Sequence, residues 1–157
     1  MMTVNESIPN LVNICVDAIE EGDIKGRYYH KYSRSAHVFE NVMDLVLEME
    51  KLFDALDYPQ ATTRLRSFSK DKEQKKTVEK MESVWENAVF SEERGEKATF
   101  LVSVKTRANA GWQGEVIWVE KKNTGKFRSL LELIKMLDGV QQQDEAGISD
   151  SLEIEER

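Results

Sequence analysis

Two segments of this chain carry the same order of apolar and polar positions without a gap. This similarity constrains the fold more than any other feature of the sequence. Residues 12–50 align with residues 100–138 at an offset of 88 positions. The few identical pairs are Val16/Val104, Gly26/Gly114, Phe39/Phe127 and Leu45/Leu133. A pattern that recurs over this length indicates one building block used twice.

Each copy opens with two stretches that are typical of β-strands. Apolar residues alternate with polar ones from Val12 to Ala18, and the same alternation begins again at Phe100. A period of two is the signature of a strand. A polar link that contains Gly follows, and a second strand is predicted near 24–32 and near 112–121.

The alternation also indicates which side of the second strand is buried. Trp112 and Trp118 share a parity with Gly114 and Val116, so we expect both Trp side chains in the core. Cross-strand partners share a face. Pairing Val16 with Gly26 or Tyr28 in the first copy therefore needs an odd loop length, such as three residues with Gly22 in the left-handed conformation.

Each copy closes with an amphipathic helix. Ser129 followed by Glu132 is a capping box, and Asn41 followed by Asp44 is a weaker form of it. Apolar residues then recur with helical spacing in both copies. They are Val42, Met43, Val46, Met49 and Leu52 in the first copy, and Leu130, Leu131, Ile134, Leu137 and Val140 in the second.

One strand–strand–helix unit cannot bury its apolar face alone, whereas two units can share a core. The sequence therefore predicts an α+β fold of two pseudo-symmetric strand–strand–helix repeats. We expect a four-stranded, largely antiparallel sheet with two helices on one face, and leave the strand order open. Repeat one is assigned to 12–54, the connector to 55–99 and repeat two to 100–142, within a single domain of residues 1–142.

The segments outside the two copies have distinct compositions. In the connector, a helix is predicted at about 71–89. Its apolar stripe consists of Val78, Met81, Val84, Trp85, Ala88 and Val89. Residues 143–157 carry six acids against Arg157, in a chain whose net charge is −7. Such an acidic tail is expected to be solvated and disordered, with a role in partner binding as the alternative.

Few residues could carry catalysis or bind a metal. Cys15, His30 and His37 are the only cysteine and histidines, and no pair has the spacing of a zinc site. Cys15 lies in the middle of a predicted strand without a cationic neighbour to lower its pKa. No phosphate-binding or dinucleotide motif occurs. We therefore expect a protein that is not an enzyme, with no cofactor and no metal, and a core or edge role for His30.

The outer face of the predicted sheet favours a role in protein interaction. It would present a partly apolar set of side chains, Tyr29, Leu101, Ile117 and Val119. Two arrangements are open. The face can be a surface for a partner or a second copy of the chain. Alternatively, the connector helix covers it, with Trp85 as the anchor. The first arrangement predicts an interaction or adaptor domain, including a homodimer.

The connector supports an alternative function, the binding of single-stranded nucleic acid. Between residues 62 and 80, seven basic residues stand against three acids. The basic residues are Arg64, Arg66, Lys70, Lys72, Lys75, Lys76 and Lys80. Basic side chains that bind phosphates and aromatic side chains that stack on bases are what such proteins use. The chain is acidic overall, so we rank this function second.

Four stretches, GRYYH, YPQATTRLRSF, WQGEVIWVEK and FRSLLELIKMLD, together resemble a family of small hypothetical proteins of clostridial and related Firmicutes. The resemblance covers roughly residues 4–140 and implies a bacterial, cytoplasmic protein. It brings no assigned activity, cofactor or catalytic residue. The residues themselves agree with that setting: a lone cysteine fits a reducing compartment, and neither a signal peptide nor a membrane span is predicted.

Overall fold

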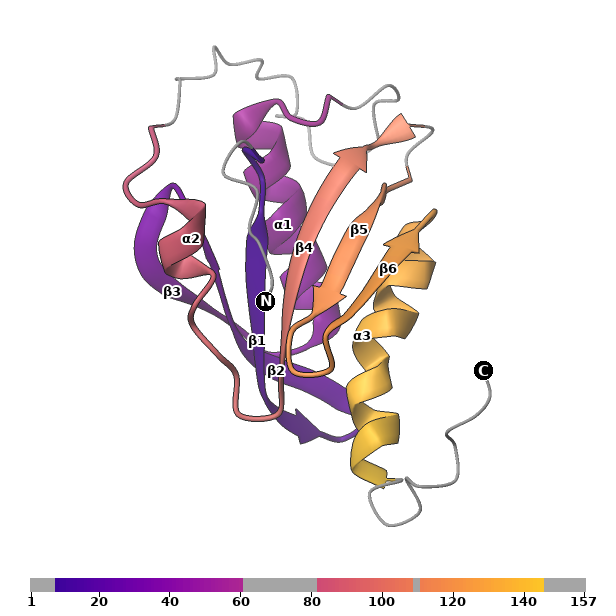
Figure 1. Ribbon diagram of the computed structural model, residues 1–157. Coiled ribbons are helices and arrows are strands. Elements are labelled where there is room, and N and C mark those ends of the chain that lie inside the picture. The colour runs from indigo at the N-terminus through magenta and orange to yellow at the C-terminus, as the bar shows by residue number, and fades with distance from the viewer. Residues whose placement is uncertain (1–7, 61–81, 109–110, 146–157) are drawn as a thin grey trace.

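The computed structural model describes residues 8–60, 82–108 and 111–145. Its elements in chain order are β1 (Val12–Glu20), β2 (Asp23–His30), β3 (Ser33–Phe39), α1 (Val42–Leu56), α2 (Asn87–Phe90), β4 (Ala98–Thr106), β5 (Gln113–Trp118), β6 (Asn123–Phe127) and α3 (Leu130–Glu145). The strands form one six-stranded sheet in the order β3-β2-β1-β4-β5-β6, and every neighbouring pair is antiparallel. In Figure 1, α1 and α3 lie on one face of this sheet and α2 lies on the other.

The α+β class is confirmed, but the predicted four-stranded sheet of two strand–strand–helix repeats is wrong. Three strands precede each long helix, one more than the sequence predicted. The two strands that the prediction missed are β3 and β6. Both are edge strands with polar sequences, SRSAHVF and NTGKF. An edge strand buries little of its surface, so its sequence lacks the clear alternation that marked the inner strands.

The first hairpin reaches the expected register by an unexpected route. Val16 pairs with Gly26, one of the two partners that the sequence left open. The loop, however, has two residues, Glu21 and Gly22, and both have positive φ angles, 53° and 77°. Two central residues with positive φ are typical of the tight hairpin turn that matches strand twist. A bulge between Val16 and Ala18 restores the register that an odd loop length was expected to provide.

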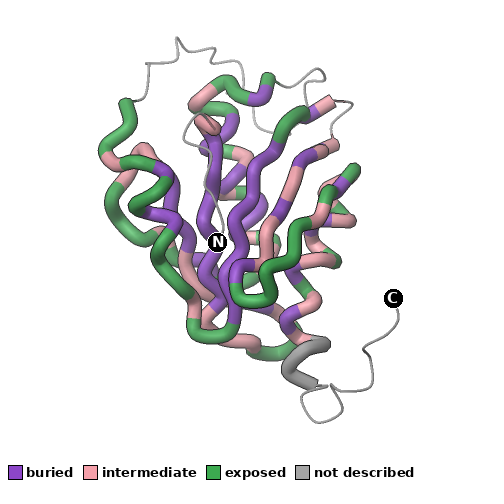
Figure 2. The backbone as a smooth tube through the Cα atoms, in the orientation of Figure 1, coloured by how far each residue is buried: buried purple, intermediate pink, exposed green. Residues whose placement is uncertain are grey.

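The core lies between the sheet and the two long helices. Alternate residues of the central strands, such as Ile14 and Phe100, point to this side and are fully buried. Leu45 and Phe53 of α1 and Leu133 of α3 meet them there. Figure 2 shows the resulting concentration of buried residues along β1 and β4. Trp112 is also buried on this side, with its ring against Phe53, as the parity of the strand predicted.

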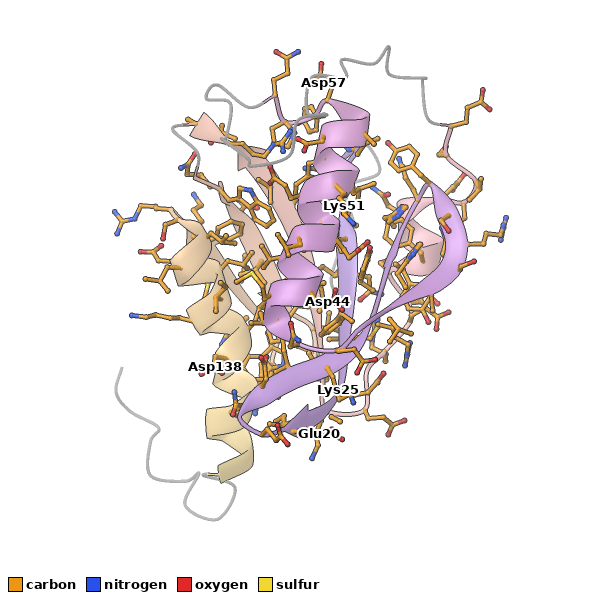
Figure 3. The ribbon with its side chains drawn as sticks, turned by 180° about the vertical axis from the view of Figure 1, so that it is seen from behind. Glu20, Lys25, Asp44, Lys51, Asp57 and Asp138 are labelled. Atoms are coloured by element: carbon orange, nitrogen blue, oxygen red, sulfur yellow. The ribbon has the colours of Figure 1, made fainter. Side chains whose placement is uncertain are left out.

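Both predicted helix starts are confirmed by the caps. The Asn41 side chain accepts a hydrogen bond from the Asp44 backbone N–H at 2.8 Å. In α3, the Ser129 hydroxyl accepts one from the Glu132 N–H at 3.1 Å. These bonds satisfy backbone donors that a helix leaves free in its first turn. In Figure 3, α1 runs from Asp44 near its start to Asp57 at its end, beside α3 with its Asp138.

The connector differs from the expected long helix in its described part. Residues 82–86 are not helical, and α2 contains only Asn87–Phe90. Residues 71–81 of the predicted helix lie outside the described residues. At the C-terminal end, α3 continues to Glu145 and so includes the first three residues that we assigned to the tail. The rest of that tail lies outside the described residues.

A buried arginine joins the end of α1 to the β4–β5 connection. The Arg107 side chain is 3% exposed and pairs with Asp54 at 2.9 Å and with Glu50 at 3.3 Å. Its Nε also donates to the Pro59 carbonyl at 2.6 Å. The Trp112 indole N–H donates to Glu50 at 3.2 Å. A buried guanidinium needs such partners, so these contacts fix α1 against the far half of the sheet.

Within the described ranges, no helix combines the length and the apolar character that crossing a membrane requires.

The bulge in the first hairpin predicts an intolerant glycine. A Cβ at Gly26 would lie 2.0 Å from the Cys15 carbonyl oxygen, whereas a Cβ at Gly111 would meet nothing closer than 3.5 Å. Gly26→Ala is expected to lower the free energy of unfolding by about 3 kcal/mol. Gly111→Ala is expected to leave it unchanged or raise it slightly. Urea unfolding of both variants measures the difference, and equal stabilities would contradict the packing described for β1 and β2.

Candidate functional site

The four residues of the predicted interaction face do come together on the outer side of the sheet, but that face is closed. Tyr29, Leu101 and Val119 are only 8%, 5% and 9% exposed, and Ile117 packs beside them. Trp85 and Phe90 of the connector cover this cluster, together with Ile8 and Leu11 from the N-terminal segment. Of the two arrangements that the sequence left open, the connector therefore covers the face, as an irregular segment followed by α2. We call residues 82–97 the cover.

Hydrogen bonds attach the cover to the middle of the sheet. The Asn13 side chain is fully buried, and its amide donates to the carbonyls of Phe90 at 2.8 Å and of Glu93 at 3.1 Å. The Arg27 guanidinium pairs with Asp17 and also donates to the Arg94 carbonyl at 3.0 Å. A buried amide without these acceptors would cost free energy, so Asn13 favours the closed arrangement.

A second group of contacts holds the start of the cover at the corner between β2 and β3. The Trp85 indole N–H donates to the His30 carbonyl at 2.7 Å, and the Val84 N–H donates to the Lys31 carbonyl at 2.8 Å. Arg34 donates to the Val84 carbonyl at 2.9 Å and lies over the Trp85 ring at 5.5 Å. We call this group the corner clasp.

The two histidines of the chain are stacked beside the clasp, on the opposite face of the sheet from the cover. The ring centroids of His30 and His37 lie 5.0 Å apart, with 11° between their planes. The Tyr28 ring also stacks against His37 at 4.9 Å and lies 6.2 Å from the His30 ring. The His30 Nδ1 accepts the backbone N–H of Tyr32 at 3.1 Å. The His37 Nε2 is buried without a hydrogen-bond partner.

These surroundings keep both histidines neutral over much of the pH range. Burial, with a smaller contribution from the neighbouring His37, lowers the pKa of His30 from 6.5 to about 4. Burial also lowers the pKa of His37, although the Glu48 carboxylate on α1 acts in the opposite direction. Burial raises the pKa of Tyr28 as well, with a contribution from Glu48, to which its hydroxyl donates at 3.4 Å. The charged form of either imidazole is therefore disfavoured here.

The stacked pair is poorly arranged for metal binding or nucleophilic catalysis. The nitrogen lone pairs of parallel imidazole rings lie in parallel planes and do not converge on one ion. Within the described residues, no group of three or more His, Cys, Asp or Glu could hold a metal. Cys15 belongs to the covered cluster, across the sheet from both histidines, so neither can act as its base. Burial also raises the pKa of Cys15 to about 12.

The basic residues that suggested nucleic-acid binding cannot be placed. All seven, from Arg64 to Lys80, fall within 61–81, which lies outside the described residues.

The β3 edge is a surface feature that sequence reasoning missed, because β3 itself was not recognised. This strand is at one end of the sheet and, in the part of the chain that the structure describes, pairs only with β2. Its Val38 points outward with 66% of its surface exposed, the largest fraction among the exposed large apolar residues. The signal available in the sequence was the short alternation of Ala36, Val38 and their neighbours after a two-residue turn.

No family model, no curated protein and no solved structure matches this chain.

The corner clasp predicts the effect of a conservative change at Trp85. Trp85→Phe keeps an aromatic ring on Tyr29 and Phe90 but removes the indole N–H that donates to His30. The free energy of unfolding is expected to fall by about 1 kcal/mol. The matched control is Trp118→Phe, whose indole lies at the other side of the molecule against Phe100. Urea unfolding compares the two, and an unaffected Trp85→Phe variant would contradict the clasp.

The histidine pair predicts a loss of stability in acid. The pKa of His30 is about 4 in the folded protein and 6.5 as a free group. Below pH 6.5 the unfolded chain therefore binds a proton that the folded chain does not, and stability falls as the pH drops toward 4. The contribution of His30 to the free energy of unfolding is fully present above about pH 7.5. Its loss in acid lowers that free energy by roughly 3 kcal/mol. Urea unfolding across this range measures it, with His30→Asn expected to flatten the dependence.

Proposed function

We propose that this protein is a non-enzymatic interaction domain that associates with a second copy of itself through the outer edge of β3. The observation that carries the proposal is this unpaired edge with an exposed apolar residue on it. An edge strand presents backbone N–H and C=O groups that can pair with another strand. We keep the cytoplasm as the proposed setting.

The other edge of the sheet is better protected than β3. Strand β6 has five residues, and Lys126 is exposed on it. Strand β3 has seven residues, and its only Lys, Arg, Asp or Glu is Arg34, whose guanidinium donates to the Val84 carbonyl. Its exposed Val38 carries no charge. Natural proteins block edge pairing with short strands and with lysines. The β3 edge is longer than the β6 edge, so another strand can pair with it more readily.

A strand that pairs antiparallel with its own copy forms a two-fold symmetric interface. The two copies then contribute the same surface to the interface, so each contact is made twice, once in each direction. This is the usual geometry of a homodimer. Two copies of β3 would join two six-stranded sheets into one and would bring the two Val38 side chains onto a common face. This shared surface is what supports self-association over an unspecified partner.

Binding of single-stranded nucleic acid remains the alternative proposal, with weaker support. Such proteins stack bases on exposed aromatic rings. Here Tyr29 is covered and Trp112 is 4% exposed in the core, so neither offers an open platform.

Substitution of Val38 tests the proposed interface. Val38→Lys places two like charges near the two-fold axis and is expected to weaken dimerisation by more than about tenfold. Leu131→Lys is the matched control, since Leu131 is 60% exposed on α3 and far from the edge. Light scattering with size-exclusion chromatography over a concentration series gives the dissociation constants.

Two results would contradict the proposal. One is a strictly monomeric wild-type protein at the highest soluble concentration. The other is a dimer that Val38→Lys and Leu131→Lys affect equally. A fluorescent single-stranded oligonucleotide that binds at low salt and is released at high salt would favour the alternative.

A further inference from the structure

The turn between β2 and β3 is shared by the histidine stack and the cover. On one side of the sheet, His30 holds the turn through its ring, whose Nδ1 accepts the Tyr32 N–H. On the other side, the carbonyls of His30 and Lys31 accept the hydrogen bonds of Trp85 and Val84. The Tyr32 hydroxyl also donates to the Pro9 carbonyl at 2.8 Å. Any rearrangement of this turn therefore changes the acceptors that hold the cover.

We propose that the β2–β3 corner is a proton-sensitive clasp, in which protonation of His30 releases residues 82–90 and uncovers the apolar outer face of the sheet. This inference goes beyond self-association and does not depend on it.

The chemistry of the imidazole provides the coupling. In the neutral ring, Nδ1 is an acceptor and the proton is on Nε2. A proton taken from solvent can bind only at Nδ1, which then becomes a donor facing the Tyr32 N–H. Two donors at 3.1 Å repel each other, so the ring and the turn must move apart. The carbonyls of His30 and Lys31 belong to the same turn and lose their alignment with Trp85 and Val84.

The groups around the ring oppose protonation in the closed state. His37 is stacked at 5.0 Å and is nearer to Glu48 of α1, which favours charge on His37. A proton on His37 then disfavours a second proton on His30, since the two rings titrate as a coupled pair. The other titratable neighbours are Tyr28 on β2 and Tyr32 on the turn, both neutral in this range. The cover contributes the uncharged Trp85 indole.

Release of the cover would expose a defined surface. Tyr29, Leu101 and Val119 would lose the contacts of Trp85 and Phe90, and Cys15 lies in the same cluster. Cys15 is fully buried in the closed state and is the only cysteine of the chain. Its thiol is therefore a built-in reporter of opening.

The experiment measures labelling of Cys15 by 4,4′-dithiodipyridine, divided by the rate for free cysteine at the same pH. The pKa of His30 is about 4 in the closed state and 6.5 when the ring is solvated in the open state. The open population is therefore expected to rise about 30-fold between about pH 7.5 and pH 5. His30→Asn is expected to abolish this rise. Its side-chain oxygen can accept the N–H two residues on, as the imidazole does, but it takes up no proton in this range.

His37→Phe is the matched control. It removes the other histidine, keeps a ring on Tyr28 and leaves the turn bond intact, so the acid response is expected to persist. The measurements are repeated in the Val38→Lys background, where self-association is weakened. A response that His30→Asn retains, or that His37→Phe alone abolishes, would overturn the proposal. So would an absence of any response in the wild-type protein.

Opening of the clasp must also be separated from unfolding of the whole domain. A local opening exposes little surface, so the labelling rate at pH 5 should depend on urea much less steeply than global unfolding does. Labelling with the full urea dependence of unfolding would show that acid acts on the entire fold and would refute a local clasp.

Discussion

The antiparallel pairing of β1 with β4 is the constraint on which the rest of the structure depends. These strands lie in the middle of the sheet and join residues that are far apart in the sequence, from Val12 opposite Val102 to Val16 opposite Ala98. Both faces of the pair are buried. The long helices cover one face, and the other face, with Asn13 and Leu101, needs a second layer. The connector supplies that layer. This explains why such a short and irregular segment is held to the sheet by so many hydrogen bonds.

The sequence predicted the parts of the fold that are buried and periodic. The inner strands, both helix starts and the inward Trp112 all followed from alternation, capping and parity. The edge strands did not, because a polar strand that buries one side looks like a loop. The cover was also misjudged. Apolar residues at helical spacing were read as one helix, whereas in residues 82–90 tertiary contacts to the sheet decide the backbone.

The candidate site was less accessible from the sequence than the fold. His30 and His37 were taken separately, and their stacking could be foreseen only after β3 was known to fold back on β2 through a two-residue turn. The outer-face residues were correctly grouped, but whether they were open depended on the connector. The carbonyls of His30 and Lys31 accept the hydrogen bonds of Trp85 and Val84 that hold the cover on the outer face. A sequence does not show which backbone carbonyls act as acceptors in this way.

The long reach of the Asn13 bond to the Phe90 carbonyl has a consequence for the order of folding. The two residues are 77 positions apart, so the bond cannot form until the chain has closed a large loop. Contacts of such sequence separation form slowly. Hairpins β1–β2 and β4–β5 are local and need only tight turns. A nascent chain would therefore assemble both hairpins first, and only later pair β1 with β4 and dock the connector. Until that last step, the apolar outer face would be available to chaperones and to other unfinished chains.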